Sequence, residues 1–78
     1  IHHTIIDMMP LHKTLSSRER EVLRLVAHEY TTPEIARLLY LSTHTIDTHK
    51  KNLKMKLDVR NSAGMVRRGF EIGLLQAS

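Results

Sequence analysis

The amino-acid sequence predicts an all-α domain built from four helices. Three observations support this class. Serine, threonine or asparagine residues suited to capping precede four segments of the chain. Each of these segments spaces its apolar residues three and four positions apart, as a helix with one buried face requires. No stretch alternates between apolar and polar residues with the period of two that is typical of a strand. The 78 residues suffice for one such domain.

The first helix is predicted to begin after Ser16, which stands three residues before Glu19. This Ser-x-x-Glu pattern is a capping box, in which the two side chains satisfy two backbone N–H groups that have no partner inside the helix. Leu15 precedes the cap, and Val22 and Leu23 lie on the apolar face that follows. We therefore expect the folded domain to begin close to Leu15.

The second and third helices follow each other closely. Thr32 is predicted to cap the second helix, with Pro33 in the first helical position, and the helix should end near Tyr40. Ser42 then caps a third helix that spans about residues 43–57. Two helices separated by about three residues cannot be collinear, so this spacing predicts a helix-turn-helix arrangement.

The fourth helix is predicted to be capped by Asn61 or Ser62 and to extend to about Leu75. It has two apolar faces, one formed by Ala63, Val66, Phe70 and Leu74, and the other by Met65, Gly69 and Ile72. A terminal helix of a small domain needs only one such face for its core. We expect the first face to be buried and the second to form a twofold dimer contact. The alternative is that the second face packs against residues 1–14 or an upstream domain.

Residues 1–14 show no sustained periodicity and contain Pro10, so they are interpreted as a linker or the tail of a preceding domain, ahead of a domain at 15–76. The chain begins with Ile1 rather than Met, and we interpret it as part of a longer protein. No apolar run approaches the roughly 18 residues that a membrane span needs. The absence of cysteine excludes disulfides and is compatible with a reducing cytoplasm.

The net charge of +4 is unevenly distributed along the chain. Acidic and basic residues cancel over residues 1–41, so the whole positive excess lies within residues 42–78. A concentrated basic region favours a polyanionic partner. Charge alone is equally compatible with an ordinary solvated surface.

The third helix separates its apolar and polar residues when it is drawn as a helical wheel. The side predicted to face the core carries Ile46, His49, Leu53 and Leu57, and the opposite side carries Asp47, Thr48, Lys51, Lys54 and Met55. Lys50 and Lys56 flank the apolar stripe, and Lys56 is expected to be a solvated surface residue. A lysine-rich helix beyond a tight turn suits the DNA major groove, which is about 12 Å wide.

The position of each residue on this helix predicts its role. Residues in the first half of such a helix approach base edges, so Asp47, Thr48 and Lys51 are the candidates for base contacts. Lysine can donate to guanine, aspartate can accept from cytosine, and a threonine methyl can touch the methyl of thymine. The candidates for phosphate contacts are Thr32, Thr45, Lys50 and Lys54. For Thr45 the alternative is a hydrogen bond to its own backbone.

Neither a metal site nor an active site is expected. His44 and His49 point to different sides of their helix, and His2 and His3 have no carboxylate or cysteine at ligand spacing. His49 is interpreted as a packed histidine. No nucleophile with a neighbouring base and no glycine-rich phosphate loop is present, so we expect neither catalysis nor a cofactor.

The sequence between Leu15 and Leu75 resembles the LuxR-type helix-turn-helix domain, the output module of response regulators of the NarL/FixJ type. The matching positions are Leu15, Ser16, Arg18, Glu19, Glu21, Val22 and Leu23, then Glu34, Ile35, Ala36 and Leu38, then Ser42, Thr45, Ile46 and His49, and finally Lys56, Leu57 and Val59. Two positions depart from the family pattern. Asp47 stands where many members carry lysine, and Ser62 stands where arginine is frequent.

This resemblance implies a four-helix domain whose third helix reads double-stranded DNA and whose fourth helix forms a homodimer on it. The base contacts of the family fall on Asp47, Thr48 and Lys51. The resemblance also implies an N-terminal receiver domain phosphorylated on aspartate, and RNA polymerase is a further expected partner. The predicted function is sequence-specific transcriptional regulation in a two-component system. The alternatives are a promoter-binding region like that of a sigma factor and a protein-interaction module with a basic face.

Overall fold

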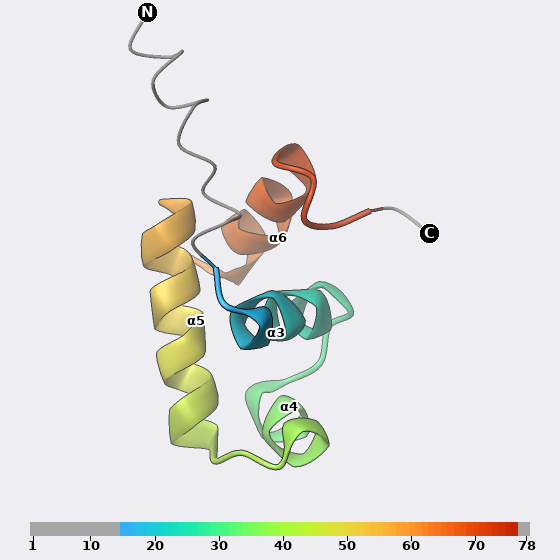
Figure 1. Ribbon diagram of the computed structural model, residues 1–78, viewed down its shortest axis with the longest axis vertical. Coiled ribbons are helices and arrows are strands. Elements are labelled where there is room, and N and C mark those ends of the chain that lie inside the picture. Colours follow the sequence, from blue (N-terminus) through green and yellow to red (C-terminus); the bar gives the residue numbers. More distant parts are fainter. Residues whose placement is uncertain (1–14, 77–78) are drawn as a thin grey trace, which may run out of the picture.

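The computed structural model describes residues 15–76 and contains four helices within them (Figure 1). They are α3 (Ser17–Ala27), α4 (Thr32–Leu39), α5 (Thr43–Leu57) and α6 (Ser62–Glu71). The predicted all-α class is confirmed. The linker expected at residues 1–14 lies outside the described residues.

Three of the four helices begin at a residue that the sequence predicts as a cap. The Ser16 hydroxyl accepts a hydrogen bond from the Glu19 N–H at 3.0 Å, and the Ser16 N–H donates to the Glu19 carboxylate at 2.9 Å. The Ser42 hydroxyl accepts from the Thr45 N–H at 3.0 Å. Of the two candidates before α6, Asn61 is the cap, because its side-chain oxygen accepts from the Gly64 N–H at 2.9 Å.

The predicted cap of α4 is wrong by one residue. Thr31 is the cap, so Thr32 takes the first helical position and Pro33 the second. The Thr31 hydroxyl accepts from the Glu34 N–H at 3.3 Å, and the Thr31 N–H donates to the Glu34 carboxylate at 2.8 Å. Thr31 has a glutamate three residues ahead, whereas Thr32 has Ile35 there. Only Thr31 can therefore form the reciprocal capping box.

Helix α5 is the longest helix, and it packs against each of the other three. Figure 1 shows α4 beside its first turns, α6 beside its last turns and α3 between them. The α4–α5 turn is tight: Tyr40 adopts a left-handed conformation with φ of 57°, and the Leu41 N–H donates to the Ala36 carbonyl at 2.9 Å. This turn ends α4 and reorients the chain before Ser42 caps α5, as a helix-turn-helix requires.

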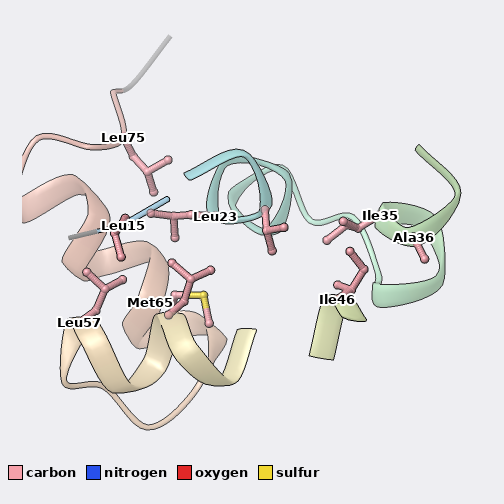
Figure 2. Close-up of a cluster of buried hydrophobic side chains, with 10 residues drawn as sticks. Leu15, Leu23, Ile35, Ala36, Ile46, Leu57, Met65 and Leu75 are labelled. Carbon is pink, nitrogen blue, oxygen red and sulfur yellow. The ribbon is translucent and has the colours of Figure 1, made fainter. Parts of the chain in front are cut away.

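The hydrophobic core extends along the inner side of α5. It consists of Leu15, Val22, Leu23, Ile35, Ala36, Ile46, Leu53, Leu57, Met65 and Leu75. In Figure 2, Ile46 of α5 points toward Ile35 of α4 at one end, while Leu57 and Met65 gather with Leu15 at the other. A different helix therefore anchors each end of α5. All of these contacts are made on its inner side, so its outer side stays uncovered.

The predicted dimer face of α6 is wrong, and the predicted core face is only half correct. Met65, expected in a dimer contact, is fully buried within the monomer, and Gly69 is buried beside it. Ile72 is partly buried and packs against the same core. Of the face expected in the core, Phe70 is 47% exposed and Ala63 is exposed, whereas Val66 and Leu74 are partly buried and pack against the core as predicted.

The end of α6 explains why Met65 and Gly69 are buried within the monomer. The helix ends at Glu71 rather than near Leu75, and Gly73 reverses the chain with φ of 81°. The Leu75 N–H donates to the Gly69 carbonyl at 3.0 Å, and the Leu75 side chain packs over Gly69. A β-carbon at Gly69 would lie 2.7 Å from Leu75 Cδ1. The glycine therefore allows the chain end to close over the core within one monomer.

Candidate nucleic-acid interface

The outer side of α5 presents the three predicted base-contact residues to solvent. Asp47, Thr48 and Lys51 are all exposed, while Ile46 and Leu53 on the inner side are fully buried. Residues 47, 48 and 51 lie one turn apart or less, so they form a single patch in the first half of the helix. Nothing in the described part of the monomer covers this patch.

Two of the predicted phosphate-contact residues lie together across the helix-turn-helix. The Lys50 ammonium donates a hydrogen bond to the Thr32 hydroxyl at 2.7 Å, which joins α5 to the first turn of α4. Lys50 is held by a neutral hydroxyl, so its positive charge stays uncompensated. The N-terminus of α4 adds backbone N–H groups and the positive end of its dipole to the same place. This local arrangement can accept an anion.

The two threonines of α5 make different hydrogen bonds. The Thr45 hydroxyl accepts from the Ser42 hydroxyl at 2.9 Å, so its own O–H is left to donate outward. The Thr48 hydroxyl donates to the His44 carbonyl at 3.1 Å within the helix. Thr48 can therefore offer an acceptor oxygen or its methyl group to a base, whereas Thr45 keeps the donor that a phosphate oxygen needs.

The expectation that Lys56 is a solvated surface residue is wrong. Its ammonium lies 2.9 Å from the carboxylate of Glu19, whose side chain is only 6% exposed. Burial raises the pKa of Glu19, but the hydrogen bonds from Lys56 and from the Ser16 N–H outweigh it, so the pKa is lowered overall. The ion pair ties the last turns of α5 to the start of α3, 37 residues away. Sequence spacing alone carries no signal of this pairing.

Several basic residues on the outer side and at the end of α5 have no acidic partner among the described residues. Within residues 15–76, neither Lys51, Lys54 nor Arg60 forms an ion pair, whereas Arg67 and Arg68 both pair with Glu71. Lys51, Lys54 and Arg60 line one shallow groove at the end of α5. Arg60 belongs to the basic half of the sequence, but it follows the third helix and so has no place on that helical wheel.

The described residues can be compared with the requirements of a metal site and of a membrane span. Over residues 15–76, no group of three His, Asp or Glu side chains is placed to hold a metal ion. None of the helices in that range combines the length and apolar character that crossing a bilayer requires.

Comparison with known proteins agrees with this arrangement. The family model described as "Bacterial regulatory proteins, luxR family" matches residues 13–68. Over 60 residues the chain is 38% identical to the uncharacterized response regulatory protein YgeK of Escherichia coli, covering 77% of this chain and 41% of that protein. It is also 38% identical over 61 residues to the transcriptional regulatory protein MctR of Rhizobium johnstonii, covering 78% of this chain and 28% of that protein.

A third relative is the response regulator protein VraR of Staphylococcus aureus, which is 35% identical over 66 residues. That alignment covers 85% of this chain and 32% of VraR. The chain thus corresponds to less than half the length of each of these relatives. The family match covers both helices of the helix-turn-helix and most of α6. The chain belongs to the luxR family of bacterial regulatory proteins.

Proposed function

We propose that this domain binds double-stranded DNA with sequence preference by placing the first half of α5 in the major groove. The observation that carries the proposal is the exposed patch of Asp47, Thr48 and Lys51, held on a helix whose opposite side is fully buried. Lys51 can donate to the O6 and N7 of guanine, and Asp47 can accept from the amino group of cytosine. Thr48 offers its methyl group or its acceptor oxygen to a third base edge.

Phosphate contacts would fix the orientation of this helix on the duplex. The Lys50–Thr32 pair, at 2.7 Å, forms the first contact together with the N–H groups at the start of α4. Thr45 provides a hydroxyl donor at the start of α5, and Lys54 provides a positive charge one turn beyond Lys51. These contacts position the protein without reading sequence.

The whole protein acts, in this proposal, as a cytoplasmic response regulator in which an N-terminal receiver domain is phosphorylated on aspartate. The names of YgeK and VraR as response regulators support this assignment. Its output is regulated transcription, with RNA polymerase as the further partner. The luxR family match favours this function over a sigma-factor-like region or a protein-interaction module.

Two copies of the domain would bind DNA together through the exposed face of α6. Ala63 and Phe70 are exposed on this face, and Val66 lies partly buried between them. A twofold axis brings the same face of both helices together, and the small Ala63 allows a close approach. Phe70→Glu should leave the monomer folded and weaken binding to paired half-sites more than to single ones. Equal losses on both kinds of site would contradict this contact.

A salt series tests the DNA-binding proposal directly. The affinity for a duplex recovered by selection from a random pool is measured between 50 and 200 mM salt. The logarithm of the binding constant should fall with the logarithm of salt by about 0.9 for each phosphate neutralised. A selected duplex should also bind more tightly than a scrambled one. A flat salt response, or equal binding of selected and scrambled duplexes, would contradict the proposal.

A further inference from the structure

A basic groove begins at Lys51, the last of the residues proposed to contact bases, and extends to the C-terminal end of α5. It is lined by Lys51, Lys54, Met55, Asp58, Val59 and Arg60. Three positive charges and one negative charge line it, so the groove carries a net positive charge. Met55, which is 68% exposed, adds an apolar surface among these charges. The groove is therefore suited to a ligand with a negative charge beside an apolar group.

The positive charges of this groove are not used within the domain. Lys51, Lys54 and Arg60 form no ion pair among residues 15–76, although Asp58 lies in the same groove. Asp58 ends α5 in a left-handed conformation with φ of 57°. This conformation sets the direction in which the chain leaves the helix, and therefore the position of Arg60. Arg60 is thus held just past the helix end, on the side of α5 that carries Lys51 and Lys54.

The length of α5 indicates what this end of the helix meets on a duplex. The helix has 15 residues, which corresponds to about 22 Å at about 1.5 Å per residue. From Asp47 to Leu57 the rise is about 15 Å. The major groove is about 12 Å wide, so a helix that reads bases with residues 47–51 and crosses the groove reaches its bordering strand with its last turn. That border is a sugar–phosphate backbone.

We propose that the groove formed by Lys54, Met55 and Arg60 binds one phosphate of the DNA strand bordering the major groove. Arg60 and Lys54 contact the phosphate oxygens, and Met55 contacts the adjoining sugar. Asp58 repels the same phosphate and so limits the affinity of the contact. This inference rests on the proposed function, and it extends the DNA surface from α5 into the α5–α6 loop. An acidic protein segment is the competing occupant of the groove.

Arg60→Gln tests the contact by removing one charge while keeping a side chain that can form hydrogen bonds. The loss of one phosphate contact lowers the salt slope by about 0.9. The ratio of wild-type to variant affinity should therefore fall about 3.5-fold when salt is raised from 50 to 200 mM. The probe is the selected duplex, and the measurement is fluorescence anisotropy across the salt series.

Arg24→Gln is the matched control. Arg24 is exposed on α3 and lies beside Gly73 and Leu74, which follow α6, rather than beside α5. It removes the same charge from the domain, so any effect of net charge alone should be equal in both variants. The proposal expects the salt slope of Arg24→Gln to match the wild type. Equal slopes for Arg24→Gln and Arg60→Gln would overturn it.

Asp58→Asn provides a test in the opposite direction. Asparagine tolerates the left-handed conformation that residue 58 adopts, so the helix end is retained while the negative charge is removed. This variant should bind the selected duplex more tightly at 50 mM salt, and the gain should shrink as salt rises. Unchanged or weaker binding by a folded Asp58→Asn would contradict the placement of a phosphate in this groove.

A scan of uncharged methylphosphonates along the duplex locates the phosphate. Neutralising one bordering position should weaken the wild type but add nothing to the loss already caused by Arg60→Gln. If the wild type binds DNA with sequence preference and every position affects both proteins equally, this inference fails while the proposed function stands. If the wild type shows no salt-dependent DNA binding, the proposed function fails first. If Arg60→Gln weakens the binding of an acidic peptide but not the binding of DNA, the groove binds protein and the inference is overturned.

Discussion

Glu19→Gln removes one charge from the contact that joins α3 to the end of α5. The Glu19 carboxylate is 6% exposed and lies 2.9 Å from the Lys56 ammonium, whose side chain is 35% exposed. Glutamine preserves the size of the side chain and keeps an oxygen for the Ser16 N–H, so the capping box survives. The substitution therefore removes the ion pair and the negative charge in the first turn of α3 while keeping the cap.

The expected loss follows from the surroundings of each partner. Hydrogen bonds to charged groups contribute about 1.5–3 kcal/mol. Lys56 keeps partial access to water, which screens its charge once the carboxylate is gone. We therefore expect a loss of about 1–2 kcal/mol in the free energy of unfolding at pH 7. For a domain of this size that corresponds to a fall in Tm of roughly 4–16 °C.

The loss should depend on pH in a defined direction. Burial raises the pKa of Glu19. The interactions with Lys56 and Ser16 together lower it by more than burial raises it, so the pKa in the folded state lies below the pKa in the unfolded state. Such a group contributes stability above its unfolded pKa of about 4.3, and this contribution disappears as the pH falls through the folded pKa. The difference in free energy of unfolding between wild type and Glu19→Gln should therefore be largest at pH 7. It should shrink as the carboxylate protonates below about pH 4.

Thermal and urea unfolding, followed by circular dichroism at pH 7 and pH 3, measures both expectations. The matched control is Glu21→Gln, because Glu21 pairs at 3.1 Å with Arg18 and both side chains are nearly half exposed. Exposed pairs contribute about 0–1 kcal/mol, so this control should change stability little. Equal losses in the two variants, or a Glu19→Gln gap that is unchanged at pH 3, would refute the reasoning.

Three further predictions test the core, the base contacts and one helix start. In urea unfolding, Met65→Ala should lower the free energy of unfolding by about 2–5 kcal/mol and Phe70→Ala by about 1 kcal/mol. A larger loss for Phe70→Ala would instead support the predicted faces of α6. In competition binding with selected and scrambled duplexes, Lys51→Ala should reduce the discrimination between them by about 1–3 kcal/mol. Lys54→Ala should weaken the binding of both duplexes alike. The same pattern of losses for the two variants would contradict these roles. Thr31→Ala should lower the free energy of unfolding by about 1 kcal/mol, and a neutral result would argue against its capping box.

Features that depend on neighbouring residues could be predicted from the sequence. The capping box of Ser16 and the cap at Ser42 involve groups three residues apart, so the local pattern determines them. The exposed patch on α5 follows from helical periodicity, because only one side of that helix is apolar. The same local rule, applied to Thr31 and Glu34, would have placed the start of α4 correctly.

Features that depend on tertiary packing could not be predicted in this way. Both faces of α6 are apolar, so periodicity cannot choose between them, and the choice depends on how Gly73 turns Leu75 back over Gly69. The ion pair between Lys56 and Glu19 joins residues 37 positions apart and depends on how α5 crosses α3. Arg60 follows a left-handed residue at the end of α5, so its direction depends on the loop and not on a helical wheel.

The central claim is that the exposed side of α5 enters the major groove. The most direct measurement is the set of intermolecular nuclear Overhauser effects between an isotope-labelled domain and an unlabelled selected duplex. We expect contacts from the side chains of Asp47, Thr48 and Lys51 to thymine methyl groups and cytosine H5, which face the major groove. Contacts from these side chains to minor-groove protons, or contacts to bases made only by α3 or α6, would contradict the claim.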